Sequence, residues 1–326
     1  MKEKFGLYAR GVGVVRIGTC SWADEALSKY FYPRGVPAKE RLAHYATHFD
    51  TVEVDSTYYR LPTEQMVAGW AERTPPGFVM HVKAFGMLTR HPVKLETLPP
   101  DLRDAVGTDE RGRVERPPRE VRAEVFRRFR EALEPLRAAG KLGGLLFQFP
   151  AYIVRKPSSL EYLSWIREQA GPDELLVEFR HRSWLEDDTR AETLAFLEGL
   201  GATYVLVDAP KTEAKNLIPT VVARTSANAY LRFHGRNAGT WNVRGRSAAE
   251  RFDYLYGDDE LREWVEPLRA LAEGAETVWA FFNNNGRSPG GEEGPEWIAQ
   301  AATNAVRLRE LLEEAAVPVA SEPHEM

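Results

Sequence analysis

The chain has 326 residues, with 43 Lys and Arg against 48 Asp and Glu, so its formal net charge is -5. Hydrophobic residues make up 43% and charged residues 28%, which is typical of a soluble globular protein and excludes a collagen, coiled-coil or disordered chain. The single cysteine, Cys20, excludes an internal disulfide framework and a cysteine-rich zinc module, and we expect it to be a small buried hydrophobe.

The same arithmetic bears on location and partners. No apolar window of about 18 residues exists, so no membrane span is expected. Residues 1–6 lack the apolar region of a signal peptide, so we expect a cytoplasmic protein. The mild acidity argues against a basic nucleic-acid-binding surface over the whole chain, but it leaves a local basic patch open.

Short apolar runs recur along the chain, and each predicts a β-strand. The eight runs are Val14–Cys20, Thr51–Asp55, Phe78–Lys83, Gly144–Phe149, Leu175–Phe179, Tyr204–Asp208, Ala229–His234 and Thr277–Phe282. Stretches with helical spacing lie between and after them, at 38–49, 64–73, 119–139, 158–170, 189–200, 260–273 and 296–316. Only residues 209–228, between the sixth and seventh strands, lack such a pattern. This alternation predicts parallel strands joined by right-handed crossovers.

Eight strand–helix units in about 300 residues predict an α/β protein with a single (β/α)₈ TIM-type barrel. An open doubly wound sheet is the alternative, but Gly18-Thr19-Cys20-Ser21-Trp22 does not fit the dinucleotide fingerprint expected after its first strand. We predict one barrel domain over residues 1–316 and a disordered tail over 317–326. A long insertion rich in proline and charge, residues 86–118, follows the third strand, and such segments are lids, binding loops or disordered.

Polar side chains follow the strands on one face. Barrel enzymes work at the C-terminal strand ends, and residues two apart in a strand share a face. The pairs that alternate with apolar neighbours are Glu53 and Asp55, His81 and Lys83, Glu178 and Arg180, and Arg232 and His234, while Gln148, Asp208 and Asn283 fall at or near strand ends. Seven of the eight strands therefore place a polar group at one end of the barrel, which predicts a binding pocket there.

Each of these residues also has a structural interpretation. Glu53, Lys83, Glu178 and Arg180 could form an ion-pair network that only fills the barrel mouth, although charges gathered in one pocket more often mark function. For Lys83, an ion pair with Glu53 or Glu178 is favoured over a Schiff-base nucleophile. His234, like His81, is either an acid/base group or a hydrogen-bonded core residue.

A metal site is the less favoured interpretation. Ligand types that barrel metalloenzymes use are present at Glu53, His81, Glu178, Asp208 and His234. The sequence lacks HxH, HxxE and DxH spacings, and the neighbouring Lys and Arg side chains compete for the carboxylates. We therefore predict no metal and no cofactor, with a divalent metal ion as the alternative.

Loops after the strands add further candidates. Residues 234–239, with Arg236, and residues 283–288, with Asn284, follow the strands whose loops bind phosphate in many barrels, although Asn and Gly there also suit plain turns. The aromatic residues Trp22, Tyr58, Tyr59, Trp184 and Trp241 also follow predicted strands, where they either stack on a sugar or base or pack within loops.

These motifs, taken in order, resemble the YecE-like family, which is domain of unknown function 72. The matching segments are 17–22, 30–33, 49–59, 82–85, 146–150, 177–184, 230–236 and 280–284, so the resemblance spans nearly the whole chain. It implies a TIM barrel related to sugar isomerases and similar in build to DNA-repair endonucleases. The chain departs from the family in its longer insertion, where Leu88-Thr89-Arg90-His91 is the nearest match to a Thr-His pair, and after the seventh strand, where Trp241-Asn242 and residues 252–256 replace a tyrosine-containing segment.

Together these observations predict an enzyme that uses acid/base chemistry on a small phosphorylated or carbohydrate-like ligand. The expected catalytic residues are Glu53, Lys83, Glu178 and His234, with the two glutamates transferring protons. The expected substrate-binding residues are Ser21, Trp22, Asp55, Tyr58, Gln148, Arg180, Trp184, Asp208, Arg232, Arg236, Asn283 and Asn284. Two alternatives stay open: nucleic-acid binding, with or without phosphodiester cleavage, at an Arg- and aromatic-lined mouth, and a non-catalytic ligand sensor.

Overall fold

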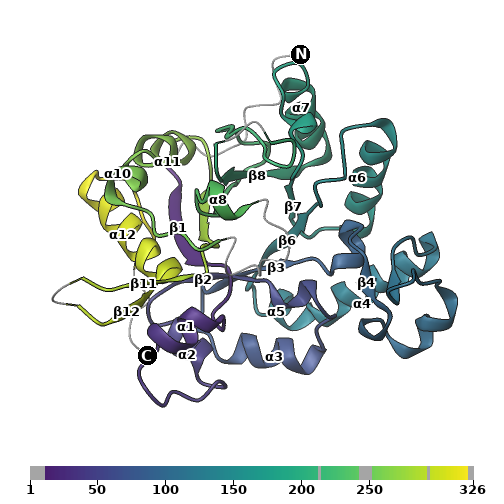
Figure 1. Ribbon diagram of the computed structural model, residues 1–326, viewed down its shortest axis with the longest axis horizontal. Helices are drawn as coiled ribbons and strands as arrows, with labels where there is room; N and C mark the ends of the chain where they lie inside the picture. The colour runs from purple at the N-terminus through teal and green to yellow at the C-terminus, as the bar shows by residue number, and fades with distance from the viewer. Residues whose placement is uncertain (1–11, 212–213, 242–251, 292–293, 322–326) are drawn as a thin grey trace.

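A computed structural model describes residues 12–211, 214–241, 252–291 and 294–321. Eight parallel strands form one nearly closed sheet in the order β1-β10-β9-β8-β7-β6-β3-β2, and Figure 1 shows helices surrounding them. The strands are β1 (Val14–Thr19), β2 (Thr51–Val54), β3 (Val79–Lys83), β6 (Leu142–Gln148), β7 (Leu175–Glu178), β8 (Ala202–Asp208), β9 (Ala229–Phe233) and β10 (Thr277–Phe282). The predicted TIM-type barrel and its eight strands are confirmed.

The α-helices follow the predicted pattern with differences at their ends. They are α1 (Glu25–Tyr30), α2 (Arg41–Tyr45), α3 (Glu64–Glu72), α4 (Arg119–Ala132), α5 (Glu134–Ala138), α6 (Pro157–Ala170), α7 (Arg190–Leu200), α8 (Ala238–Trp241), α10 (Asp258–Arg262), α11 (Val265–Ala272) and α12 (Gln300–Glu314). The helix predicted over 119–139 is split, because Pro135 has no N–H to continue the ladder and sits in the first turn of α5. The helix predicted over 296–316 starts only at Gln300, because β12 (Trp297–Ala299) pairs antiparallel with β11 (Arg287–Pro289).

The barrel closes between β1 and β2 through contacts other than a regular ladder. The backbone of Cys20 bridges to Glu53, and the N–H of Ser21 donates to the carbonyl of Glu53 at 2.9 Å. Below this point the hydroxyl of Tyr45, from α2, accepts from the N–H of Thr19 at 2.9 Å and donates to the carbonyl of Thr51 at 3.1 Å. Glu53 is thereby fixed at the closure of the barrel.

The barrel interior below the mouth is apolar. Side chains from the neighbouring strands β6 to β10 fill it, among them Leu146, Leu176, Val205, Tyr230, Trp279 and Phe281. His81 lies among them, with its ring centroid 4.5 Å from that of Trp279 and 5.0 Å from that of Tyr230. Gly143 makes room for it, because a Cβ there would lie 2.6 Å from the His81 ring. Glu53, Glu178 and Arg232 lie above this plug, at the carboxyl ends of their strands, whereas Arg16 of β1 lies below it, over the ring of Trp279.

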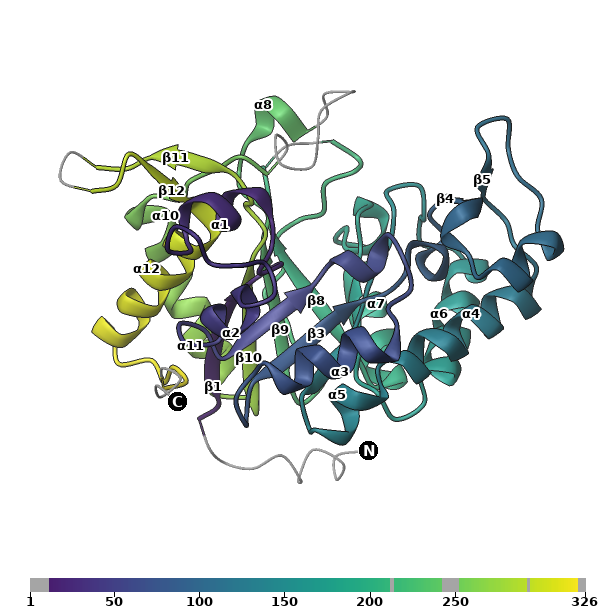
Figure 2. The ribbon, with the colours of Figure 1, turned by 90° about the horizontal axis from the view of Figure 1, so that it is seen from below.

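The insertion after β3 is built from short elements. These are the 3₁₀ turns η2 (Gly86–Thr89), η3 (Leu95–Thr97) and η4 (Pro100–Ala105), and the antiparallel pair β4 (Val93–Lys94) and β5 (Arg113–Val114). In Figures 1 and 2 the β4–β5 pair lies at one side of the molecule, beside α4 and α6. A role for residues 86–118 as a lid or a binding loop stays a prediction.

The first residues of the tail, for which disorder is predicted from residue 317, lie against β1 in the described part of the chain. Val317 is 3% exposed, and the backbone of Val319 bridges to Val15 at the start of β1. Residues 322–326 lie outside the described part of the chain. None of the described helices has the length and apolar character needed to cross a membrane.

Candidate functional site

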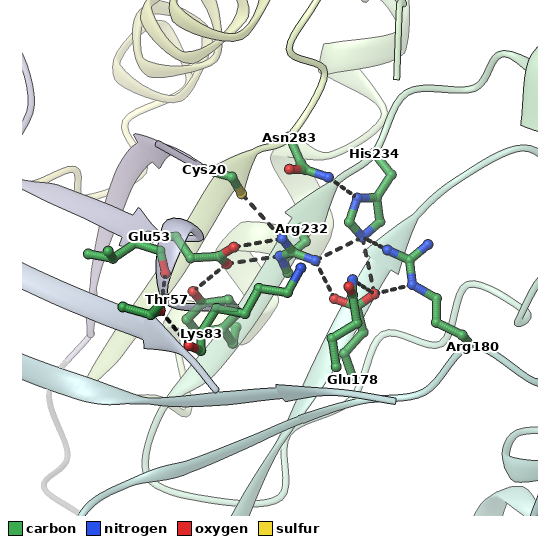
Figure 3. Close-up of polar contacts among 12 residues, drawn as sticks. Cys20, Glu53, Thr57, Lys83, Glu178, Arg180, Arg232, His234 and Asn283 are labelled. Carbon is green, nitrogen blue, oxygen red and sulfur yellow. Dashed lines mark hydrogen bonds and ion pairs between the residues drawn. The ribbon is translucent and has the colours of Figure 1, made fainter. Parts of the chain in front are cut away.

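The centre of the site is a buried arginine held between two glutamates. Arg232 of β9 donates from Nη2 to Oε1 of Glu53 at 2.6 Å and from Nε to Oε2 at 2.9 Å. Its Nη1 donates to Oε2 of Glu178, at the end of β7, at 2.5 Å. Figure 3 shows the guanidinium lying between the two carboxylates, with the thiol of Cys20 on a third side. The guanidinium thus binds carboxylates from β2 and β7, on different sides of the barrel, which fixes both glutamates.

His234 continues this arrangement on the far side of Glu178. Its Nε2 lies 3.2 Å from Oε1 of Glu178, and Asn283 donates from Nδ2 to its Nδ1 at 2.8 Å. Arg180 pairs with Glu178 at 2.5 Å and places Nη2 3.0 Å from Nε2 of His234. Burial and the charge of Arg180 hold the pKa of His234 well below its usual range, so the ring is neutral near pH 7.

The protonation state of Glu178 is fixed by its neighbours. Burial alone would raise the pKa of this carboxyl, but Arg180 and Arg232 more than offset it and hold the pKa well below its usual range. A carboxylate in that position does not take up a proton near neutral pH. The proton-transfer role predicted for Glu178 therefore does not suit this geometry.

Glu53, Glu178, Arg232 and His234, which we call the buried cluster, are all 0% exposed. Buried ion pairs seldom stabilise a fold more than apolar residues of the same volume would, so the cluster needs a reason other than stability. Because Arg232 is enclosed by its partners, the structure places it beneath the mouth rather than at a surface where an anionic substrate could reach it. The cluster is suited to positioning the residues above it.

Half-buried polar side chains lie above the buried cluster. Gln148 donates from Nε2 to Oε1 of Glu178 at 2.8 Å, and Arg180 reaches the same carboxylate from the next strand. Asp55 and Lys83 follow β2 and end β3, and both are partly exposed. Burial raises the pKa of Asp55, while the charge of Lys83 opposes that rise.

The ion pair predicted for Lys83 from the sequence is wrong. The ion pair expected with Glu53 or Glu178 is absent, and the described residues offer its Nζ no hydrogen bond either. Nζ lies 4.8 Å from the centroid of the Tyr58 ring. The two glutamates are engaged by arginine, whose planar fork of donors binds a carboxylate at two points.

A cavity of about 220 Å³ opens at this end of the barrel. It is lined by His91, Gln148, Phe149, Pro150, Ala151, Arg180, Asn216 and Phe252. His91 comes from the insertion, and its Nδ1 lies 2.8 Å from the hydroxyl of Thr89. Burial, with the charges of Lys83 and Arg180, lowers the pKa of His91 to about 3.

His91 is not among the site residues predicted from the sequence. The Thr89–His91 match to a Thr-His pair was the signal that could have found it. We use "mouth group" below for Asp55, Lys83, His91, Gln148 and Arg180.

Several other predicted site residues lie outside the buried cluster and the mouth group. Asp208 belongs to the outward face of β8 and accepts from Nε of Arg236 at 3.0 Å, while Nη2 of Arg236 reaches Glu263 at 2.9 Å. Asn284 donates to the carbonyl of Tyr254 and to Oδ1 of Asn304, both at 2.8 Å. These contacts tie the loops after β9 and β10 to the surrounding helices.

The aromatic candidates divide in the same way. Trp184 is 1% exposed and stacks on Phe179 at 4.1 Å, so it packs within the core. Trp22 is half-buried and meets Trp70 edge-on, whereas Tyr58 lies directly beneath the amine of Lys83. Tyr59 is 63% exposed. The side chain of Trp241 lies outside the described residues.

Ser21 stands out by its backbone. Its φ of 110° lies in a region that side-chain-bearing residues seldom adopt, and its Oγ accepts from the N–H of Ala23 at 3.0 Å. Such strain often accompanies a functional site, and here it occurs where β1 ends beside Glu53.

Among the residues that the structure describes, no group of three or more His, Cys, Asp or Glu side chains is arranged to hold a metal ion.

The chain is similar to known proteins of one family. The model of "Protein of unknown function DUF72" matches residues 16–325. The UPF0759 protein YunF of Bacillus subtilis is 30% identical over 289 residues, which cover 87% of this chain and 94% of that protein. A DUF72 family protein of Enterococcus faecalis superposes with a TM-score of 0.73 at 25% identity, covering 92% of this chain and 96% of the other. One from Thermotoga maritima gives 0.70 at 31%, covering 92% and 99%. The chain belongs to the DUF72 family, as the ordered motifs indicated.

Proposed function

We propose that the protein is an enzyme that uses acid/base chemistry on a small, polar, anionic substrate of a phosphorylated or carbohydrate-like kind. The substrate would bind at the mouth group, above the buried cluster. The observation that carries this proposal is the placement of costly buried charges at the carboxyl ends of barrel strands, directly beneath a lined cavity.

The charges at the mouth suit an anion. Three carboxylates, Glu53, Asp55 and Glu178, meet three cations, Lys83, Arg180 and Arg232. Burial raises the pKa of Asp55, so this carboxyl gives up its proton less readily than an exposed one would. Arg180, which lines the cavity and is held by Glu178, would bind the anionic group.

Proton transfer is better assigned to the mouth group than to the two glutamates. Burial raises the pKa of Asp55, which makes this carboxyl the better proton donor of the site, whereas His91, with a pKa of about 3, would be a neutral hydrogen-bonding group. Glu53 and Glu178 would act as positioning residues, because each already accepts from Arg232. His234 would steady Arg180 rather than touch the substrate.

The test is ligand binding and turnover with a panel of aldose and ketose phosphates and the matching free sugars. Thermal-shift binding is measured first, and interconversion of each ligand that binds is then followed by NMR. We expect phosphorylated ligands to stabilise the wild-type protein and Arg180→Gln to weaken that binding by about tenfold or more.

Arg137→Gln is the matched control. Arg137 of α5 also pairs with a carboxylate, Asp173, but it does so before the start of β7, at the opposite end of the barrel. It should leave binding unchanged. A panel that gives neither a thermal shift nor turnover with the wild-type protein would contradict the proposed function.

Nucleic-acid binding is a second candidate, and one groove favours it. The groove, about 640 Å³, lies between the insertion and the start of α6 and is lined by Arg90, Arg116, Arg122 and Lys156 together with Glu115 and Tyr152. Tyr152 is 58% exposed, which suits stacking on an unpaired base. Fluorescence anisotropy with a single-stranded oligonucleotide at low and high salt tests it. Binding that weakens steeply with salt and is lost in Arg116→Glu supports this candidate, and no binding at low salt rejects it.

A further inference from the structure

The amine of Lys83 lies in an environment unlike that of Lys141, a buried lysine of the same structure. Lys141 is 7% exposed, and its Nζ donates to the carbonyl of Thr74 at 2.6 Å, to the carbonyl of Ala71 at 2.7 Å and to the hydroxyl of Thr74 at 3.1 Å. All three protons of that ammonium are used, as expected for a structural lysine. Lys83 has none of these contacts within the described residues, and its Nζ lies over the face of Tyr58, 4.8 Å from the ring centroid.

The carboxylates around Lys83 do not hold it. Glu53 and Glu178 accept three hydrogen bonds from Arg232, and Glu178 also accepts from Gln148 and pairs with Arg180. Figure 3 shows the Lys83 side chain extending toward Arg232 and Glu178 with no contact drawn at its amine. The main chain of Lys83 is fixed, because the hydroxyl of Thr57 donates to its carbonyl at 2.6 Å. The backbone of Lys83 is thus held in place, while its amine makes no hydrogen bond or ion pair with the described residues.

We propose that Lys83 is a nucleophile that forms an imine with the carbonyl group of an anionic aldehyde or ketone bound at the mouth group. This inference rests on the proposed function, since it names the substrate class of that same site. Amines that react in this way are kept from ion pairing and placed in a partly desolvated pocket.

Independent features of the site agree with this assignment. Burial and the charge of Arg232 lower the pKa of Lys83, which increases the share of the neutral, nucleophilic amine. Arg180 lines the adjoining cavity together with His91 and would hold the anionic group of the substrate. Asp55 lies close enough for its charge to act on the pKa of Lys83.

The step balances with groups already present. The neutral amine of Lys83 attacks the carbonyl carbon, and the C=O electron pair moves to oxygen, which takes the proton that nitrogen loses. The resulting hydroxyl takes a second proton, from Asp55, and leaves as water while the nitrogen lone pair forms the C=N bond. The protonated imine then accepts the electron pair of an adjacent C–H bond, whose proton passes to the Asp55 carboxylate, which serves isomerisation. In aldol cleavage it accepts the pair of an adjacent C–C bond instead, and the other carbon leaves as a carbonyl group while its hydroxyl proton passes to the same carboxylate.

Reductive trapping tests the proposal. The full-length protein is incubated near pH 7 with sodium cyanoborohydride and one of three probes: glyceraldehyde 3-phosphate, pyruvate or acetaldehyde. Peptide mass mapping then gives the modification rate of each lysine. We expect Lys83 to react about tenfold or more faster than exposed Lys94 with the two anionic probes, and Lys141 to stay unmodified. Arg180→Gln should slow the two anionic probes more than it slows acetaldehyde.

Two outcomes separate this inference from the proposed function. If sugar phosphates bind and turn over but Lys83→Arg keeps the turnover and no probe marks Lys83, the imine is overturned and the proposed function stands. If Lys83 is marked selectively although no sugar phosphate binds, the nucleophile stands and the phosphorylated substrate class falls. Equal labelling of Lys83 and exposed Lys94 with all three probes would overturn the inference.

Discussion

At the scale of single residues, His81 shows what an unpaired polar side chain does to stability. Neither ring nitrogen has a hydrogen-bond partner among the described residues, and the ring is enclosed by Tyr230, Trp279 and Phe281. Burial lowers the pKa of His81 to about 3. The sequence predicts that His81 is either an acid/base group or a hydrogen-bonded core residue. In the described structure it is a core residue whose ring makes no hydrogen bond.

The sign of the resulting pH dependence follows from the lowered pKa. Above the unfolded pKa of about 6.5 the ring is neutral in both states, so it does not oppose folding. As the pH falls below that value, the unfolded chain binds a proton on this ring and the folded protein does not. The free energy of unfolding therefore decreases until the pH reaches the folded pKa. By pH 5 this one residue should reduce the free energy of unfolding by about 2 kcal/mol relative to pH 7.

We therefore expect His81→Leu to gain on the wild-type protein by about 2 kcal/mol when the pH is lowered from 7 to 5. Urea unfolding at the two pH values measures this difference, in which the other titrating groups cancel. The control is His48→Leu, because His48 is exposed and its replacement leaves the barrel interior untouched. Unfolding curves of His81→Leu and wild type that shift in parallel with pH would contradict the prediction.

Arg232, at the centre of the site, binds both buried glutamates. Strand periodicity predicts that Glu53, Glu178 and Arg232 point into the barrel, since residues two apart share a face. Periodicity does not say which cation takes which carboxylate. Arg232 binds both because its forked donors span them, whereas the amine of Lys83 is a single point charge.

At the scale of elements, the closure of the barrel depends on how close β1 comes to β2. A Cβ on Gly18 would lie 2.4 Å from the carbonyl oxygen of Thr51, a distance that real Cβ atoms do not reach. The hydroxyl of Tyr45 then joins the two strands where a ladder is missing. Gly18 thus permits the approach that brings Glu53 against the end of β1.

Gly18→Ala should therefore destabilise the protein by about 1–3 kcal/mol, because the added methyl group must push two strands apart. Gly199→Ala is the matched control. Gly199 lies in α7 with open space around its Cα, so alanine there should gain about 0.5 kcal/mol from its better helix propensity. Chemical denaturation of both variants provides the comparison. Equal stability of the two variants would show that the strands yield without cost.

The insertion marks the limit of prediction from local pattern. Residues 86–118 have no sustained period of two or of 3.6, so their short turns and the β4–β5 pair could not be placed from sequence. His91 reaches the cavity because η2 turns the chain back at Arg90, whose φ is 63°. A loop residue of this kind is located by the path of the chain and not by periodicity.

At the scale of the whole molecule, the end of the described chain is part of the barrel. The carbonyl of Pro318 accepts from the N–H of Val15, and the N–H of Ala320 donates to the carbonyl of Val15. Arg309 of α12 donates to the carbonyl of Ala320 at 3.0 Å. This segment lies against the first residues of β1, at the end of the barrel opposite the site.

A chain that ends at residue 316 should lose about 2–4 kcal/mol of unfolding free energy, from the buried side chain of Val317 and the lost backbone hydrogen bonds. A chain that ends at residue 321 keeps all of these contacts and should unfold like the full chain. Thermal unfolding of the two truncated chains measures the difference. A melting temperature that is the same for both would mean that the tail adds nothing to the barrel.

The sequence by itself determined the strands, their parallel order along the chain and the inward direction of Glu53, Glu178 and Arg232. Those features depend on local periodicity and on the fixed handedness of crossovers, both of which are written in consecutive residues. Only the tertiary structure decided that Arg232 binds both glutamates, that Lys83 is left unengaged, that Asp208 and Arg236 face outward and that His91 joins the cavity. These outcomes depend on distances across the barrel and on competition between cations for the same carboxylates, and neither is encoded in the spacing of neighbouring residues.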